Sequence, residues 1–188
     1  MCGILGIVGR GFSQNNNWIK ENIIKISHRG PDDRGIWNSN DQLVCFGHTR
    51  LSILDLSSKN HQPLIDEERK VSLIFNGEIY NYLDVRTQLE NLGHRFKTNG
   101  DTEVLLKSYI QWKEDCFKKI EGMFAFSICD EKRKKVFLVR DQYGQKPLYY
   151  KYINQTLKFG SELQLFLNDA DSKLNINNLN KYLYFGFV

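Results

Sequence analysis

Short apolar runs separated by turn residues dominate this chain, and they predict β-strands. The runs are rich in Val, Ile, Phe and Tyr, which pack well on a pleated surface. They cover residues 3–8, 43–49, 71–76, 123–130, 136–141, 148–152 and 156–159. From residue 123 to residue 160 the runs follow one another through tight turns, one of them the basic stretch 132–135. This half of the chain is therefore predicted to be antiparallel.

A different periodicity predicts helices over residues 17–27, 83–91 and 102–119. The last of these repeats apolar side chains near helical spacing, and Asp101 stands where an N-cap is expected. The strand beginning at Met123 is almost continuously apolar, which is typical of a strand buried on both faces. Two stacked sheets between helical layers satisfy this pattern better than one half-exposed sheet, so the expected fold is an α+β sandwich.

Composition limits the classes of protein that remain. A chain of 188 residues, 41% hydrophobic and 26% charged, is long enough for one folded domain and is not a disordered chain. The net charge of +4, without a basic stripe, argues against nucleic acid or a membrane surface as a partner. No apolar run approaches the roughly 20 residues of a membrane span. The apolar run 182–188 indicates that residues from about 175 onward lead into a further domain.

The four cysteines and four histidines show no metal-binding spacing and no C-x-x-C pair. No signal peptide is visible at the N-terminus. The expectation is therefore a cytoplasmic protein without a metal site. Cys45, Cys116 and Cys129 lie in apolar patterns and are expected to be small core residues.

Cys2 is the first candidate for chemistry. Removal of Met1 would place a thiol and a free α-amine on one residue, which supplies a nucleophile and its general base together. An unperturbed α-amine has a pKa of ~7.7–8.0, so part of it is neutral at physiological pH. The alternative is a buried cysteine at the start of a strand, and Cys2 alone does not decide between the two.

Further residues could supply the other groups that acyl transfer to such a nucleophile requires. Asn76 and Gly77 end an apolar strand and offer an amide and a backbone N–H to an oxyanion, although a plain Asn-Gly turn has the same sequence. Arg50 is suited to binding a carboxylate. Asp101 is suited to binding an ammonium group, a function compatible with an N-cap.

Eight ordered motifs then give a resemblance that covers essentially the whole chain. The chain resembles the N-terminal glutaminase domain of class II glutamine amidotransferases, which are N-terminal nucleophile (Ntn) hydrolases, and most of all that of glutamine-hydrolysing asparagine synthetases. The motifs are Met1-Cys2-Gly3-Ile4, His28-Arg29-Gly30-Pro31-Asp32-Asp33, Gly47-His48-Thr49-Arg50-Leu51-Ser52-Ile53, Phe75-Asn76-Gly77-Glu78-Ile79-Tyr80-Asn81, Gly100-Asp101-Thr102-Glu103, Gly122-Met123-Phe124-Ala125-Phe126, Arg140-Asp141 to Lys146-Pro147-Leu148-Tyr149-Tyr150, and Phe159-Gly160-Ser161-Glu162-Leu163.

The resemblance implies a four-layer αββα sandwich of two antiparallel sheets and a role for each matching residue. Cys2 would attack the side-chain amide of L-glutamine, and Asn76 with Gly77 would stabilise the oxyanion. Arg50 would bind the substrate carboxylate and Asp101 its ammonium group. Other residues would line the pocket: Leu51, Ser52, Ile53, Leu54 and Glu78. His48 is interpreted as structural, beside the pocket, and Arg29 as bracing the loop 30–35.

The resemblance also implies partners outside residues 1–188. The glutaminase domain itself needs no cofactor and no metal. ATP and Mg²⁺ belong to a C-terminal synthetase domain, whose phosphate loop is absent from this sequence. Gln142 and Gln145 depart from the residues common in the family, in a segment expected to pack near that domain. Aspartate is the expected acceptor of the ammonia. Three alternatives remain open. The acceptor could be a sugar, a lactam or a peptide, the domain could be a catalytically silent glutamine-binding module, and the protein could form a homodimer.

Overall fold

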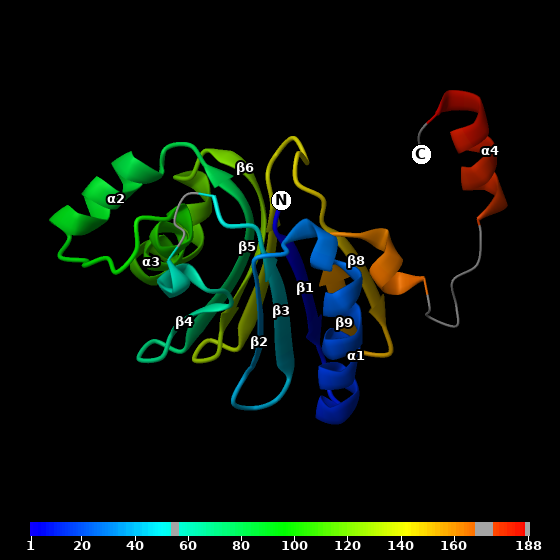
Figure 1. Cartoon of the computed structure of the whole chain (residues 1–188), viewed down its shortest axis with the longest axis horizontal. Helices are drawn as coiled ribbons and strands as arrows, with labels where there is room; N and C mark the ends of the chain where they lie inside the picture. The colour runs from blue at the N-terminus through cyan, green and yellow to red at the C-terminus, as the bar shows by residue number, and fades with distance from the viewer. Residues whose placement is uncertain (54–56, 168–174, 187–188) are drawn as a thin grey trace.

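The computed structural model describes residues 1–53, 57–167 and 175–186, and it contains two antiparallel sheets (Figure 1). The first sheet has the order β2-β3-β1-β9-β8. Its strands are β1 (Gly3–Val8), β2 (Asp33–Asn38), β3 (Val44–Arg50), β8 (Tyr149–Ile153) and β9 (Thr156–Gly160). The second sheet has the order β4-β5-β6-β7. Its strands are β4 (Leu64–Asp66), β5 (Val71–Ile79), β6 (Gly122–Asp130) and β7 (Lys135–Arg140).

The described helices are α1 (Phe12–Lys25), α2 (Tyr82–Asn91), α3 (Asp101–Trp112) and α4 (Ile176–Phe185). Of these, α1 covers the outer face of the first sheet and α3 that of the second. Short 3-10 turns lie at Ser27–Arg29, Ser58–Asn60, Lys113–Lys118 and Leu163–Phe166. Ile19 and Ile23 of α1 pack on Leu5 of the first sheet, and Leu105 and Tyr109 of α3 pack in the core cluster of the second sheet. The predicted α+β sandwich is confirmed.

A third cluster fills the space between the sheets. Ile4, Phe46 and Phe159 of the first sheet meet Ile74 and Ala125 of the second. Each of these five side chains is fully buried, so the central strands are covered on both faces, as their continuous apolar runs predict. Burial of apolar surface is the main favourable contribution to the free energy of folding of such a domain.

The structure corrects several predicted boundaries. The strands β2 and β4 were not predicted. Only Gly35 is buried in β2, and β4 has three residues, so neither shows the alternation that reveals a strand. The helix α1 begins five residues before the predicted 17. The predicted helix 102–119 ends at Trp112 and continues as a 3-10 turn.

Asp101 is not an N-cap in the expected sense. The N-cap of α3 is Gly100, and Asp101 is the first helical residue. Its Oδ2 accepts a hydrogen bond of 3.0 Å from the backbone N–H of Ile79, at the end of β5. The side chain thus links α3 to the second sheet. Among the described residues, no helix has both the length and the apolar character needed to cross a membrane.

Candidate active site

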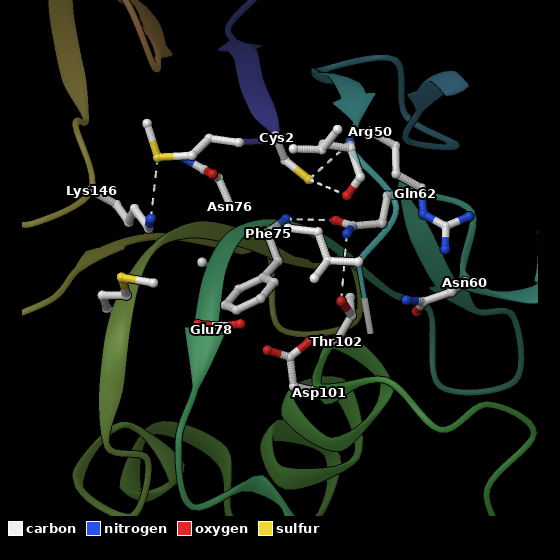
Figure 2. A pocket seen from close by; sticks show the side chains of 15 residues that line it. Cys2, Arg50, Asn60, Gln62, Phe75, Asn76, Glu78, Asp101, Thr102 and Lys146 are labelled. Carbon is white, nitrogen blue, oxygen red and sulfur yellow. Dashed lines mark hydrogen bonds between the residues drawn. The ribbon is translucent and has the colours of Figure 1, made fainter. Parts of the chain in front are cut away.

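One cavity of about 160 Å³ opens where the two sheets meet, and Figure 2 shows the side chains around it. Most of the predicted site residues line this cavity: Cys2, Arg50, Leu51, Ile53, Asn76, Gly77, Glu78 and Asp101. Ser52 is not among the lining residues, and its backbone N–H instead donates to Asp32 Oδ2 at 2.7 Å. Leu54 lies outside the described residues. Predicted site residues up to 99 positions apart in the chain, Cys2 and Asp101, therefore line the same cavity.

Cys2 directly precedes β1, which fixes the position of its thiol at the cavity. The backbone N–H of Leu51 donates to Cys2 Sγ at 3.4 Å, and Sγ lies 3.6 Å from the carbonyl oxygen of Leu51. Burial raises the pKa of the Cys2 thiol above its usual value, and the hydrogen bond from Leu51 opposes this. A thiol of this kind needs a general base before it can act as a nucleophile.

Arg29 holds the backbone of Cys2. Its Nε donates to the Cys2 carbonyl oxygen at 3.0 Å, and its Nη1 lies 3.2 Å from Glu162 Oε1. The prediction that Arg29 braces the loop 30–35 is therefore wrong. Its hydrogen bonds lead instead to Cys2 and to Glu162, in the chain that follows β9.

The edge of β5 that faces the cavity carries Asn76 and Gly77. The strand β4 pairs with β5 only as far as Leu73, so from there to Ile79 no described strand covers this edge. Phe75 and Ile79 turn their N–H groups to this edge, and the alternation of a strand directs the Gly77 N–H the same way. Asn76 Nδ2 is buried and has no hydrogen-bond partner among the described residues. Two donors thus remain for a ligand in the cavity.

Charged side chains of both signs stand on the walls of the cavity. Arg50, at the end of β3, is buried and donates from Nη1 to the carbonyl oxygen of Ser57 at 3.0 Å. Asp101 stands at the start of α3, where burial raises the pKa of its carboxyl group to about 6. Near neutral pH the cavity therefore offers a guanidinium and a carboxylate, the partners that the two charged groups of an amino acid require.

Sequence reasoning missed other lining residues: Met1, Asn60, Gln62, Phe75, Thr102, Met123 and Lys146. Lys146 is buried, and its Nζ lies 3.2 Å from Met1 Sδ. The backbone of its loop is held by Asp141, whose carboxylate accepts hydrogen bonds from Tyr143, Gln145 and Lys146. The motif beginning at Arg140 is a usable signal, but the expectation that its segment packs near a further domain does not predict that Lys146 lines the cavity.

His48 lies behind the cavity and does not line it. The ring is fully buried, and burial lowers its pKa to about 3, so it is neutral at ordinary pH. Its Nε2 lies 3.1 Å from the carbonyl oxygen of Phe75. Since that oxygen only accepts, Nε2 carries the proton. The ring supports β5 from β3, which agrees with the structural role predicted for it.

Comparison with known proteins identifies the family. A family model described as a glutamine amidotransferase domain matches residues 1–188. Glutamine-hydrolyzing asparagine synthetase 3 of Bacillus subtilis (strain 168) is 38% identical over 99% of this chain and 30% of its own. A putative asparagine synthetase 2 of Methanocaldococcus jannaschii is 41% identical over 100% of this chain and 40% of its own. The chain belongs to the glutamine amidotransferase domain family, and it spans 30–40% of the length of these relatives.

Solved structures agree on the fold. The glutamine phosphoribosylpyrophosphate amidotransferase of Bacillus subtilis superposes with a TM-score of 0.71 at 22% identity, over 88% of this chain and 43% of that one. A structure described as the allosteric regulatory enzyme of purine biosynthesis superposes with a TM-score of 0.74 at 23% identity. The two stacked sheets and their helices are thus an Ntn-type sandwich.

Proposed function

We propose that this domain hydrolyses the side-chain amide of L-glutamine, with Cys2 as the nucleophile, and releases glutamate and ammonia. The observation that carries the proposal is the convergence of three kinds of group in one cavity. These are the Cys2 thiol, the oxyanion donors at Asn76 and Gly77, and the charge pair of Arg50 and Asp101. The family membership supports the same reaction class.

Removal of Met1 converts the Cys2 amide nitrogen into a free α-amine. The neutral amine takes the thiol proton while Sγ attacks the amide carbon of glutamine and its carbonyl oxygen becomes negative. Asn76 Nδ2 and the Gly77 N–H donate to that oxygen. The tetrahedral intermediate collapses when the amine returns the proton to the departing nitrogen. Ammonia leaves and a thioester remains, which water hydrolyses to glutamate and the free thiol.

Recognition of the substrate uses its two charged ends. Arg50 binds the α-carboxylate, and Asp101 binds the α-ammonium group from the opposite wall. Glu78, Leu51 and Ile53 complete the lining around the side chain of glutamine. Because both charges of the substrate are paired in a largely buried site, analogues that lack either charge should bind weakly.

The ammonia then serves an ATP-dependent amide synthesis in a C-terminal part of the polypeptide, with aspartate as the acceptor. The names of the asparagine synthetase relatives and the share of their length that this chain covers support this assignment. The glutaminase step uses no cofactor within residues 1–188, while ATP and Mg²⁺ act in the synthetase part. A cytoplasmic location is part of the proposal, because Cys2, Cys45, Cys116 and Cys129 are all free thiols, which are typical of a reducing compartment.

The decisive experiment places a cleavable tag in front of Cys2 and compares the tagged chain with the cleaved chain whose first residue is Cys2. Glutamate release should appear only after cleavage, and Cys2→Ala should abolish it. Cys45→Ala serves as the matched control, because Cys45 is a buried core thiol whose pKa burial raises to about 12. Full activity in Cys2→Ala would remove Cys2 from the mechanism, and full activity in the uncleaved chain would remove its α-amine as the general base.

A chloroketone analogue of glutamine provides a second readout. It should alkylate Cys2 once, as peptide mass spectrometry can show, and leave Cys45, Cys116 and Cys129 unmodified, since these three side chains are buried away from the cavity. Labelling of another cysteine at the same rate would contradict the assignment of the site.

A further inference from the structure

The open edge of β5 is bound by side chains instead of a strand, and two of these side chains form hydrogen bonds with the backbone of Phe75. Gln62 Oε1 accepts a hydrogen bond of 2.7 Å from the Phe75 N–H. His48 Nε2 donates to the Phe75 carbonyl oxygen at 3.1 Å. All three residues are buried, with exposed fractions of 4%, 0% and 3% for Gln62, His48 and Phe75. Both backbone groups of the residue before Asn76 are thus fixed.

The register of the sheet explains why Gln62 stands there. In the β4–β5 pair Leu64 lies opposite Leu73, so continuing the antiparallel ladder by two residues places Gln62 opposite Phe75. The strand β4 begins only at Leu64, and Pro63, between Gln62 and the strand, has no N–H to offer a ladder. The side-chain amide of Gln62 takes the place of the missing backbone carbonyl.

The orientation of the Gln62 amide follows from its partners. The Phe75 N–H only donates, so the oxygen of the amide must face it. The amide nitrogen then points to Thr102, whose Oγ1 lies 3.5 Å from Nε2. Figure 2 shows Gln62 between Phe75 and Thr102, with dashed lines to both. Gln62 therefore spans from the strand that carries Asn76 to the first turn of α3, where Asp101 begins the helix.

We propose that Gln62 is a positioning residue for the oxyanion donors: it fixes the Phe75 peptide so that Asn76 Nδ2 and the Gly77 N–H converge on one point. This rests on the glutaminase function proposed above. Without the Gln62 acceptor, the Phe75 N–H is left buried and unsatisfied, and the strand rotates or shifts to find another partner. The two residues that follow move with it. Displacement of prearranged donors weakens the binding of the transition state more than the binding of the substrate.

The test is Gln62→Met, which keeps the length of the side chain and removes its acceptor. We expect kcat for glutamine to fall by about 10- to 100-fold, less than the 10²–10³ that follows loss of a whole oxyanion donor. The KM should change by less than about threefold, because Arg50 and Asp101 are untouched. Gln62→Glu retains an acceptor for the Phe75 N–H and should recover most of kcat near pH 8.

A binding comparison separates positioning from a change in pocket shape. The γ-aldehyde analogue of glutamine adds the Cys2 thiol and forms a hemithioacetal, whose oxygen occupies the oxyanion position. Gln62→Met should weaken binding of this aldehyde by the same factor as kcat. Binding of glutamine itself, measured in a Cys2→Ala background, should stay within about threefold. Equal losses of both ligands, or unchanged aldehyde binding, would overturn the proposal.

Controls are needed to interpret the effect of Gln62→Met on kcat. Ile74→Val removes a methylene from the buried neighbour of Phe75 and should lower the unfolding temperature without changing kcat, since Ile74 packs between the sheets. If Gln62→Met does not fold, Gln62→Glu carries the test, and its kcat must then stay near that of the wild type. A wild-type chain that neither hydrolyses glutamine nor binds the aldehyde contradicts the proposed function itself and leaves the geometry of Gln62 unaffected.

Discussion

At the scale of single residues, the site depends on groups whose ionisation is set by burial. The Cys2 thiol and the Asp101 carboxyl both have raised pKa values because their charged forms are poorly solvated. For Cys2 this favours the protonated thiol, so deprotonation must be coupled to attack. For Asp101 it brings the titration of the group proposed to bind the substrate ammonium close to the physiological range.

Asp101 gives a prediction about pH. Only the carboxylate can hold the ammonium group of glutamine, and the pKa of this carboxyl group is about 6. The KM for glutamine should therefore rise as the pH falls through 6, while kcat is governed by the α-amine at higher pH. Asp101→Asn should raise KM by roughly 10- to 100-fold at pH 7.5, the cost of about 1.4–2.8 kcal/mol for a charged contact.

Initial rates between pH 5 and pH 9 check this prediction. In Asp101→Asn, the change of KM near pH 6 should be gone, because the group that titrates there is absent. If the wild-type enzyme and Asp101→Asn show the same dependence of KM on pH, Asp101 does not bind the ammonium group.

At the scale of one element, β5 combines close packing against β6 with an open edge. Gly77 lies opposite Phe124, and a Cβ added to Gly77 would stand 2.3 Å from the carbonyl oxygen of Met123 and 2.7 Å from the Cα of Phe124. No side chain fits at this position without moving backbone. Glycine is thus required where the strand presents its N–H to the cavity.

Gly77→Ala should therefore cost stability as well as activity. Overpacking a strand against its neighbour costs about 1–3 kcal/mol, and the displaced strand carries the proposed oxyanion donors with it. Ser72→Ala on the same strand is the matched control, since the buried Ser72 Oγ has no hydrogen-bond partner among the described residues and its loss should be near neutral. Urea unfolding of both variants measures the difference. A Gly77→Ala chain as stable as Ser72→Ala would show that the strands can separate locally.

The same strand shows what sequence patterns reveal and what they do not. The apolar run of β5 predicted the element, and the Asn-Gly pair with its flanking motif predicted two residues that the structure places at the cavity. The bonds that hold Phe75 were not predictable, because they come from Gln62 and His48, 13 and 27 residues earlier in the chain. Their partners are set by the register of one sheet and by the stacking of two. Such long-range contacts leave no periodic pattern in the local sequence.

At the scale of the whole molecule, His48 couples the two sheets, since it belongs to β3 and bonds to β5. This coupling predicts a loss of stability in acid. The folded-state pKa of His48 is about 3, below the ordinary value of 6.5, so the unfolded chain takes up a proton first. Stability should fall as the pH drops from 6.5 toward 3, by about 2 kcal/mol at pH 5.

Asp101 acts in the opposite sense, because its raised pKa makes the folded state the better proton acceptor between about pH 6 and pH 4. The measurement therefore uses an Asp101→Asn background and compares it with Asp101→Asn/His48→Gln. The free energy of unfolding should fall by about 2 kcal/mol less in the double variant between pH 7.5 and pH 5. Parallel pH dependences in the two proteins would mean that His48 is solvated or charged in the folded state.

The buried central strands were more predictable from the sequence than the exposed elements around them. Strands with continuous apolar runs were located within a few residues, because burial on both faces dictates their composition. The helix α4, in contrast, is amphipathic enough to be helical, yet none of its residues is buried. Asn175 caps its first turn by accepting from the Asn178 N–H at 3.2 Å, and Gly186 ends it in a left-handed conformation. Local signals define this helix, and contacts with the sandwich do not.

The position of α4 leads to the last prediction. Figure 1 shows α4 (red) apart from both sheets, and it presents Tyr182, Leu183, Tyr184 and Phe185 to solvent. Deletion of residues 176–188 should leave the unfolding temperature and the glutaminase kcat of the processed domain unchanged, because no side chain of the cavity or of the core clusters is lost. Solubility should increase, since an exposed apolar surface promotes self-association. Calorimetry, sedimentation and glutamate release test this together, and a large loss of stability would show that α4 packs on the sandwich in solution.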